Sequence, residues 1–306
     1  MPPLRFRAGA VLALLAALLA AWVLFTRLDT LPSSSSWIVS PPGRLVDVGG
    51  FRLHLHCQGE AQPGVPVVVL EAGGGDYSAA WEWVLPELAS ETMTCAYDRA
   101  GYGWTDPGPR PRTAKRMAAE LHALLANAEI PPPYVLVAHS FGGFPARRFA
   151  VDYPHETAGL VLVDATDETT PFFTPVLTVF SVGLRIEALR TALNPQSSLR
   201  LGRPHGRSLS TFSAELFALP ATIRQVRSAP EDLGDLPLFV ISASYEPETD
   251  QVTMVQRDVM TQWSRNSRYL FIESGHAIHQ EHPEVVVQAV RTLLSPFRPA
   301  PLTGQE

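Results

Sequence analysis

Apolar and polar residues follow two alternating patterns beyond residue 43. Two short runs, 45–48 and 51–56, alternate residue by residue and meet at a Gly-Gly pair, which is typical of a tight β-hairpin. Further along, short apolar runs predict strands, and amphipathic stretches between them predict helices. The remaining strand candidates are 65–70, 93–97, 134–138, 159–163, 236–242 and 268–272, and the clearest helices are 113–128, 142–151 and 283–294. This order predicts an α/β fold with a mostly parallel eight-stranded sheet covered by helices on both faces.

One long interval carries no strand signal. About 70 residues lie between Asp164 and Leu236, and a structureless loop of that length is uncommon in a compact domain. We therefore expect a helical lid insertion over about 165–235. Its first part, 172–189, is dense in apolar residues, which is typical of a buried helix or, as an alternative, of the apolar wall of a substrate pocket.

The first 27 residues have a different pattern. An unbroken apolar run of 18 residues covers 8–25, with Arg5 and Arg7 before it and Arg27 after it. As a helix it would span about 27 Å, close to the ~30 Å hydrocarbon core of a bilayer. We interpret 1–27 as a transmembrane signal anchor. A cleaved secretory signal is one alternative, although the run ends in Trp-Val-Leu-Phe and lacks the small residues of a cleavage site. A buried helix is the other alternative.

The flanking charges predict the orientation of this segment. Two arginines precede the apolar run and one follows it, so the positive-inside rule favours a cytoplasmic N-terminus. The remainder of a single-pass protein would then lie outside the cytoplasm. Residues 28–43 are rich in serine and proline and show no periodicity, which predicts a linker between the anchor and a domain that covers 44–306.

Composition limits the function classes. The chain has 306 residues, of which 46% are hydrophobic and 18% charged, so one large folded domain can form. A net charge of -6 without any basic face argues against nucleic acid as a partner. The sequence has no Cys, His and carboxylate cluster with zinc spacing and no phosphate-binding loop, so we expect neither a metal nor an organic cofactor.

The strongest chemical signal is the segment VLVAHSFGG, residues 135–143. An apolar strand leads to Ser140 in a small-x-Ser-x-Gly setting, and a helix follows, as in a nucleophile elbow. Ala138 and Gly142 give the turn room, and the turn exposes the serine hydroxyl. The N–H of Phe141 then lies at a helix start, where it can stabilise an oxyanion. A serine that only caps a helix is the structural alternative.

A serine nucleophile needs a base, and nine histidines compete for that role. His276 stands out because it follows the last strand in a Ser-Gly-His turn, and loops at the carboxyl ends of parallel strands carry the sites of α/β sheets. We expect surface positions for His279 and His282, near the following helix. We expect His54 and His56 to line one face of the early hairpin, and His139 to be structural.

A second oxyanion donor is expected in the loop after the strand 65–70. Residues 71–75 read Glu-Ala-Gly-Gly-Gly, and glycines let backbone N–H groups approach a ligand closely. Alignment of strand ends selects the N–H of Gly73. A plain flexible turn is the alternative for a glycine run taken by itself.

Three segments together resemble the α/β-hydrolase superfamily, in its esterase and haloperoxidase-like branch. They are VVVLEAGGG, CAYDRAGYGWTDPGP with the elbow AHSFGG after it, and ESGHAIHQEHPE, and the resemblance extends from about residue 43 to 297. Two positions depart from the common pattern: Glu71-Ala72 replaces the usual His-Gly, and Ala138 replaces a glycine. Serine in place of aspartate at the elbow disfavours the epoxide hydrolase and dehalogenase chemistries of related families.

The resemblance also implies an acid and a disulfide. Members of the superfamily usually place the acid after the strand 236–242, often as Asp-Pro, and Pro247 then indicates Glu246. Asp250 and Asp164 are the alternatives. In this fold the strands that hold Cys57 and Cys95 are neighbours, so we expect a disulfide between these two residues in an oxidising compartment, with two buried thiols as the alternative.

The predicted function is that of a serine hydrolase, anchored in a membrane, which cleaves an ester or related acyl bond of a small apolar substrate through an acyl-enzyme. The predicted catalytic residues are Ser140, His276 and Glu246, with Gly73 and Phe141 as backbone donors. A cofactor-free perhydrolase or acyltransferase on the same triad is one alternative. A non-catalytic, membrane-tethered binding protein is the other.

Overall fold

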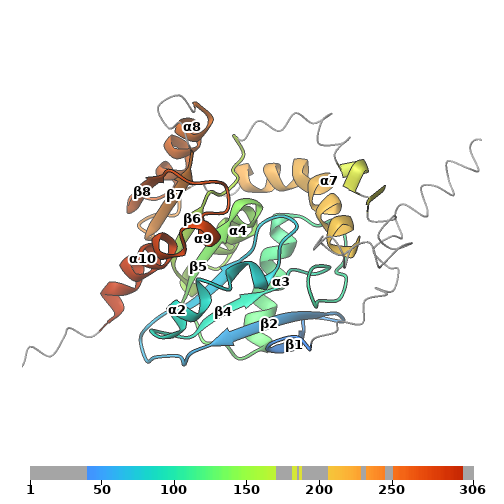
Figure 1. Cartoon of the computed structure of the whole chain (residues 1–306), viewed down its shortest axis with the longest axis horizontal. Coiled ribbons are helices and arrows are strands. Elements are labelled where there is room, and N and C mark those ends of the chain that lie inside the picture. The colour runs from blue at the N-terminus through green and yellow to red at the C-terminus, as the bar shows by residue number, and fades with distance from the viewer. Residues whose placement is uncertain are drawn as a thin grey trace, which may run out of the picture.

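The fold is an eight-stranded sheet with helices on both faces, seen in a computed structural model (Figure 1) that describes residues 40–169, 181–184, 186–187, 206–228, 232–244 and 251–298. The strand order is β1-β2-β4-β3-β5-β6-β7-β8. β1 and β2 are antiparallel to their neighbours. The other six strands, β3 to β8, are parallel to one another. The strands are β1 Arg44–Asp47, β2 Arg52–Gln58, β3 Val67–Glu71, β4 Thr94–Tyr97, β5 Tyr134–His139, β6 Thr157–Val163, β7 Leu238–Ala243 and β8 Ser267–Ile272. The predicted α/β fold and mostly parallel sheet are confirmed.

Alternate side chains of the central strands bury opposite faces of the sheet. On β5, Leu136 and Ala138 pack in one core cluster, whereas Val135 and Val137 pack in the other. The first cluster includes side chains of α3 and α4, and the second includes side chains of α2 and α10. These helices are α2 Leu85–Ala89, α3 Ala114–Asn127, α4 Gly143–Asp152 and α10 Pro283–Leu294, with α8 Gln251–Met260 and α9 Ile278–Glu281 in the C-terminal part. Both faces of the parallel strands are therefore covered, as such strands require.

A long helix, α7 Gly206–Ser228, lies in the interval between β6 and β7 where the sequence predicts a helical lid. Its Leu219 and Val226 share a small core cluster with Met117 of α3 and Phe144 of α4, and Figure 1 shows α7 lying across these two helices. Much of the rest of this interval, including most of the apolar part 172–189, lies outside the described residues.

A disulfide joins β2 to β4. Cys57 and Cys95 are paired directly across these antiparallel strands, and their Cα atoms are 4.0 Å apart. The bond closes a sequence separation of 38 residues. The predicted pairing is confirmed.

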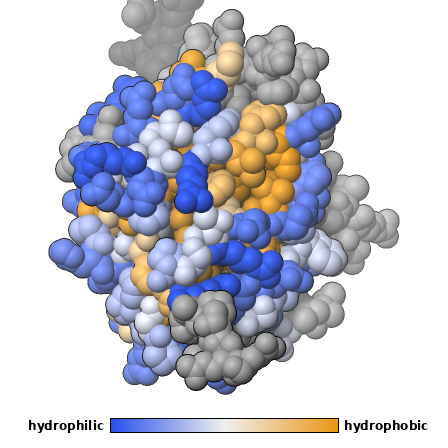
Figure 2. All heavy atoms as spheres, turned by 90° about the vertical axis from the view of Figure 1, so that its left-hand side faces the viewer, coloured by the Kyte–Doolittle hydropathy of each residue, from blue (hydrophilic) through white to orange (hydrophobic). Residues whose placement is uncertain are grey.

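The predicted membrane anchor, 1–27, and nearly all of the predicted linker lie outside the described residues. Within the described ranges, no helix combines the length and the apolar character that crossing a bilayer requires. Figure 2 shows the face that carries α8, β8 and α10, which is largely polar with one apolar area. On α8 and β8 the described residues expose two large apolar side chains, Val255 and Leu270.

Candidate active site

Ser140 occupies a sharp turn between β5 and α4. Its φ of 51° lies in the left-handed region, which residues with a side chain rarely adopt, and a short 3-10 helix, η3 Ser140–Gly142, begins at this residue. The turn needs glycine two residues on, because a Cβ at Gly142 would lie 2.6 Å from the carbonyl oxygen of Ala72. Strand, strained serine and helix start thus have the geometry of a nucleophile elbow.

A hydrogen-bonded relay starts at this serine. His276, in the loop after β8, has its Nε2 2.9 Å from Ser140 Oγ. Its Nδ1 lies 2.6 Å from Asp164 Oδ2. With the proton on Nδ1, the imidazole donates to Asp164 and leaves Nε2 free to accept the serine proton, which is the tautomer that a general base needs.

The carboxylate that contacts His276 belongs to Asp164, one of the two alternatives to the predicted Glu246. Glu246 and Asp250 lie outside the described residues. Asp164 directly follows β6, the neighbour of β5 in the sheet, and its φ of 42° turns the chain back over the strand ends. Its Oδ1 accepts a hydrogen bond of 3.1 Å from the N–H of Ala243, so both carboxylate oxygens have partners. Because Nδ1–H has one hydrogen to donate, Asp164 fills the position of the acid.

The carboxylate of Asp164 also affects the pKa of His276. Its hydrogen bond raises the pKa of His276 above the usual value for histidine; partial burial opposes that rise, and the charges of Asp164 and Asp76 add to it. A protonated His276 cannot accept the serine proton, so this raised pKa moves the loss of base function to a higher pH than for an ordinary histidine.

Two further histidines lie beneath His276, and both are buried. His139 Nε2 lies 2.9 Å from the backbone carbonyl of His276 and donates to it, which supports the predicted structural role of His139. The ring of His279 lies tilted against that of His139, with ring centroids 4.3 Å apart, and His279 is 1% exposed, so its predicted surface position is wrong. Burial lowers the pKa of His139 to about 3 and that of His279 to about 4, which keeps both rings neutral.

His54 is a second correction among the histidines. It is fully buried on β2 rather than lining a hairpin face, and its Nδ1 lies 3.1 Å from Asp98 Oδ2. The same carboxylate accepts hydrogen bonds from the N–H groups of Ser78 and Trp104 at 2.8 and 2.9 Å. Asp98 therefore holds the loop after β4 in place.

The loop after β3, residues 72–76, lies against the elbow. A Cβ added to Gly73 would be 3.3 Å from Ser140 Cβ and 2.7 Å from His139 Nδ1. Phe141, the other residue expected to donate a backbone N–H, is buried at the start of η3. The two expected donors therefore flank the serine. We call residues 72–76 the oxyanion loop from here on.

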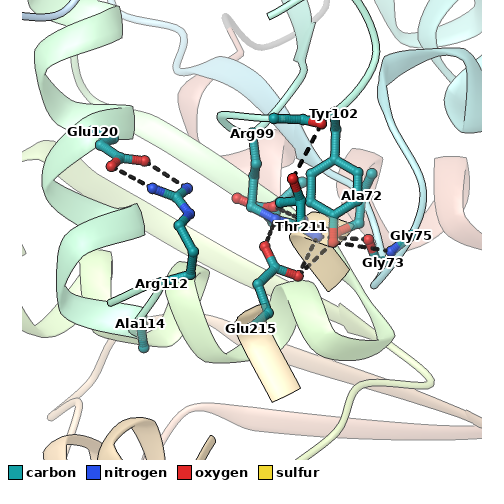
Figure 3. Close-up of polar contacts among 12 residues, drawn as sticks. Ala72, Gly73, Gly75, Arg99, Tyr102, Arg112, Ala114, Glu120, Thr211 and Glu215 are labelled. Atoms are coloured by element: carbon teal, nitrogen blue, oxygen red, sulfur yellow. Dashed lines mark hydrogen bonds and ion pairs between the residues drawn. The ribbon is translucent and has the colours of Figure 1, made fainter. Parts of the chain in front are cut away.

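A buried charge cluster around Arg99 and Glu215 supports the oxyanion loop (Figure 3). It also explains why Glu71 stands where the family usually has histidine, because Glu71 pairs with Arg99. Glu71, Arg99 and Glu215 are 1%, 3% and 0% exposed. Arg99 Nη1 donates to Glu71 Oε1 at 2.5 Å, and Arg99 Nε donates to Glu215 Oε1 at 3.0 Å. Tyrosine hydroxyls supply the remaining donors: Tyr97 to Glu71, and Tyr102 to Glu215 at 2.7 Å. Burial raises the pKa of Glu71, against the opposing effect of the Arg99 charge.

One feature of the sequence indicates this cluster. A glutamate at the end of an apolar strand and an arginine just after another are expensive to bury unless they pair. Pairing across neighbouring strands β3 and β4 was therefore predictable. Glu215, 116 residues after Arg99, gives no local signal of its partner.

Within the described ranges, no group of three or more metal-binding side chains comes together. The expectation that the protein uses neither a metal nor a cofactor stays a prediction.

Comparison with known proteins begins with families and curated sequences. A family model described as the alpha/beta hydrolase family matches residues 53–289. The uncharacterized protein YqjL of Bacillus subtilis is 25% identical over 227 residues, which are 73% of this chain and 81% of that protein. The 2-hydroxy-6-oxo-2,4-heptadienoate hydrolase of Pseudomonas putida is 35% identical over 127 residues, 40% of this chain and 44% of that protein. In two other relatives the matched part is 19% and 37% of their length.

Solved structures are similar in fold. A thermophilic esterase from Thermogutta terrifontis has a TM-score of 0.66 at 21% identity, with 85% of this chain and 100% of that chain covered. The haloalkane dehalogenase DatA from Agrobacterium tumefaciens C58 has a TM-score of 0.64 at 18% identity, with 83% and 96% covered. Because these two names describe different chemistries, the likeness extends to the fold and leaves the reaction to be argued from the site.

Proposed function

Since the chain belongs to the alpha/beta hydrolase family, we propose that it is a serine hydrolase that cleaves an ester or related acyl bond through an acyl-enzyme. The single observation that carries this proposal is the continuous relay from Ser140 Oγ through His276 to Asp164, with distances of 2.9 and 2.6 Å. A serine at the elbow forms an acyl-enzyme with a carbonyl substrate, so the residue itself separates this protein from family members whose elbow carries aspartate.

The mechanism follows from the positions of these atoms. Ser140 Oγ attacks the carbonyl carbon while His276 Nε2 takes the hydroxyl proton, and Asp164 stabilises the imidazolium that forms. The N–H groups of Gly73 and Phe141 stabilise the negative charge on the carbonyl oxygen. His276 then gives the proton to the leaving group. Water, deprotonated by the same histidine, attacks the acyl-enzyme and releases the acid.

Aromatic side chains near the serine support a small apolar substrate. Phe141 follows the nucleophile, and its ring contacts those of Phe144 and Phe212, with centroids 5.6 and 6.4 Å away. Phe212 also packs against the oxyanion loop, where a Cβ at Gly74 would meet its ring. Phe212 is the partly exposed ring of the three, so an acyl chain beside Ser140 would meet its apolar side chain.

The test is ester hydrolysis by the purified protein and by Ser140→Ala. We expect turnover of p-nitrophenyl esters of increasing chain length by the wild type, and its loss in Ser140→Ala together with loss of fluorophosphonate labelling. Ser90→Ala, at an exposed serine on a helix end, is the matched control and should retain both. Near wild-type turnover by Ser140→Ala would rule out the serine mechanism.

We further propose that residues 8–25 anchor the protein in a membrane and that the hydrolase domain lies outside the cytoplasm. The uninterrupted apolar run and the two arginines before it support the anchor and its orientation. The disulfide between Cys57 and Cys95 supports an oxidising compartment, because cytosolic thiols are kept reduced.

A further inference from the structure

One turn of α7 rests on the oxyanion loop and on the loop after β4. A Cβ at Gly74 would lie 2.3 Å from the ring of Phe212, and a Cβ at Gly101 would lie 2.2 Å from Thr211 Oγ1. Both glycines thus leave the space that this helical turn fills. Glu215 lies one turn further on, so Thr211 and Glu215 point to the same side of the helix. The helix and the two loops form a close-packed unit.

The guanidinium of Arg99 connects this helical turn to the backbone of the oxyanion loop. Besides its two carboxylate partners, Arg99 donates from Nη1 to the carbonyl oxygen of Ala72, and from Nη2 to that of Gly73 at 2.7 Å. Arginine can serve all these acceptors at once because its five N–H donors lie in one rigid plane. One side chain therefore contacts α7 and two successive peptide groups of the loop (Figure 3).

Those peptide groups include the one that carries the expected oxyanion donor. The carbonyl of Ala72 and the N–H of Gly73 belong to the same planar trans peptide and point in opposite directions. A hydrogen bond that fixes the Ala72 oxygen therefore also fixes the direction of the Gly73 N–H. Gly73 itself lies beside Ser140. The orientation of the donor thus depends on Arg99.

We propose that Arg99 is a positioning residue for the oxyanion hole, and that Glu215 makes this positioning depend on the seating of α7. The inference rests on the proposed function, in which Gly73 stabilises the oxyanion. With Glu215 in place, Arg99 is held between two carboxylates and its Nη groups reach the loop carbonyls. Without that partner, the guanidinium has an open donor in a buried site, shifts to satisfy it, and releases the loop.

A second buried ion pair provides a matched control. Arg112 donates to both oxygens of Glu120 at 2.6 and 2.8 Å, and both side chains are buried. Figure 3 shows this pair next to the Arg99 cluster. Among the described residues, the hydrogen bonds of this pair join Arg112 to Glu120 and do not reach the oxyanion loop. A change there tests the cost of disturbing a buried ion pair without disturbing the loop.

The experiment compares Glu215→Gln with Glu120→Gln in the full chain, using p-nitrophenyl butyrate. Because a misplaced oxyanion donor weakens binding of the transition state more than of the substrate, we expect Glu215→Gln to lower kcat about tenfold and to leave KM within about twofold. Glu120→Gln should leave both within about twofold. Arg99→Lys, which offers one ammonium in place of a planar fork, should lower kcat about 100-fold.

Amide hydrogen exchange over residues 72–76 gives a readout that does not depend on activity. We expect faster exchange in Glu215→Gln than in Glu120→Gln. If the wild type shows no Ser140-dependent turnover, the proposed function fails, and exchange alone then decides whether Glu215 holds the loop. Equal kcat and equal exchange in the two glutamine variants would overturn the inference. If Arg99→Lys does not fold, the comparison of Glu215→Gln with Glu120→Gln still tests the inference.

Discussion

Asp164 reaches His276 through an unusual backbone conformation. Its φ of 42° and the hydrogen bond from Ala243 to its Oδ1 direct the second oxygen to the imidazole. Ser140 shares the positive φ, at 51°. Two residues of the relay are thus held in conformations that cost energy, which is typical of sites where geometry matters more than stability.

Replacement of this acid should affect both rate and pH dependence. In Asp164→Asn we expect kcat to fall by about 10⁴, because the amide favours the wrong tautomer of His276. The carboxylate is also the main cause of the raised His276 pKa, so its removal should shift the acidic limb of the kcat/KM profile to lower pH.

Asp258→Asn is the control for that variant, since its side chain is 60% exposed on α8. It should match the wild type in rate and in pH profile. An unchanged rate in Asp164→Asn would show that another acid serves His276.

The sequence identified Ser140 and His276 because each lies in a local pattern: a small-x-Ser-x-Gly turn and a Ser-Gly-His turn after a strand. Asp164 lies in no comparable motif. It is 112 residues away from His276 in the sequence, so local spacing does not predict their contact. His279 was expected at the surface because it lies near the following helix, yet it is buried, and the ring of Trp81 lies tilted against its ring with centroids 4.7 Å apart. Tertiary contacts of this kind are not encoded in local spacing.

At the scale of elements, the sheet was predictable and several helices were not. Alternating runs marked β1 and β2, and apolar runs marked the other six strands, all to within a few residues; the central strands are apolar throughout because both of their faces are buried. The helix α2 has only five residues, too few to show a helical period, and α8, which begins just after Asp250, was not among the predicted helices although its sequence is amphipathic. The position of α7 over the oxyanion loop depends on Gly74 and Gly101, whose roles appear only when the helix is in place.

A methyl group at Gly74 should therefore disturb the seating of α7. In Gly74→Ala we expect a lower melting temperature and a lower kcat, because the new Cβ would lie 2.3 Å from the Phe212 ring, and overpacking of this kind costs about 1–3 kcal/mol. Thermal melts and ester kinetics measure the two effects.

The double variant Gly74→Ala/Phe212→Ala is the control, since it removes the ring that the methyl group meets. Its kcat should exceed that of Gly74→Ala. If kcat does not recover in the double variant, the effect of Gly74→Ala does not come from contact with Phe212 of α7.

At the scale of the whole molecule, the disulfide ties the antiparallel strand β2 to the parallel part of the sheet at β4. In the chain-entropy model, the closed loop, a separation of 38 residues, corresponds to about 4 kcal/mol of stability. We expect Cys57→Ala/Cys95→Ala to lose unfolding free energy of that order in urea. Reduction should destabilise the wild type but leave the double variant unchanged. Equal stability of oxidised wild type and double variant would show that the bond does not form in solution.

Removal of residues 1–27 should release the domain from membranes. A chain that begins at Leu28 keeps every residue of the relay, so we expect it in the soluble fraction with ester turnover equal to that of the full chain. The mass of the full-length protein shows whether the segment is retained or cleaved. Persistent membrane association of the shortened chain would reveal a second attachment, and loss of turnover would place a needed residue in the removed part.

The three buried charged residues Glu71, Arg99 and Glu215 also constrain how this protein can change over generations. Loss of Glu215 alone would leave the buried guanidinium short of a partner, and loss of Arg99 alone would leave two buried carboxylates to repel each other. Stepwise substitution therefore passes through a damaged intermediate. We expect lineages to keep Glu71, Arg99 and Glu215 as a set or to exchange them together. A collection of homologous sequences in which the three positions vary independently would contradict this.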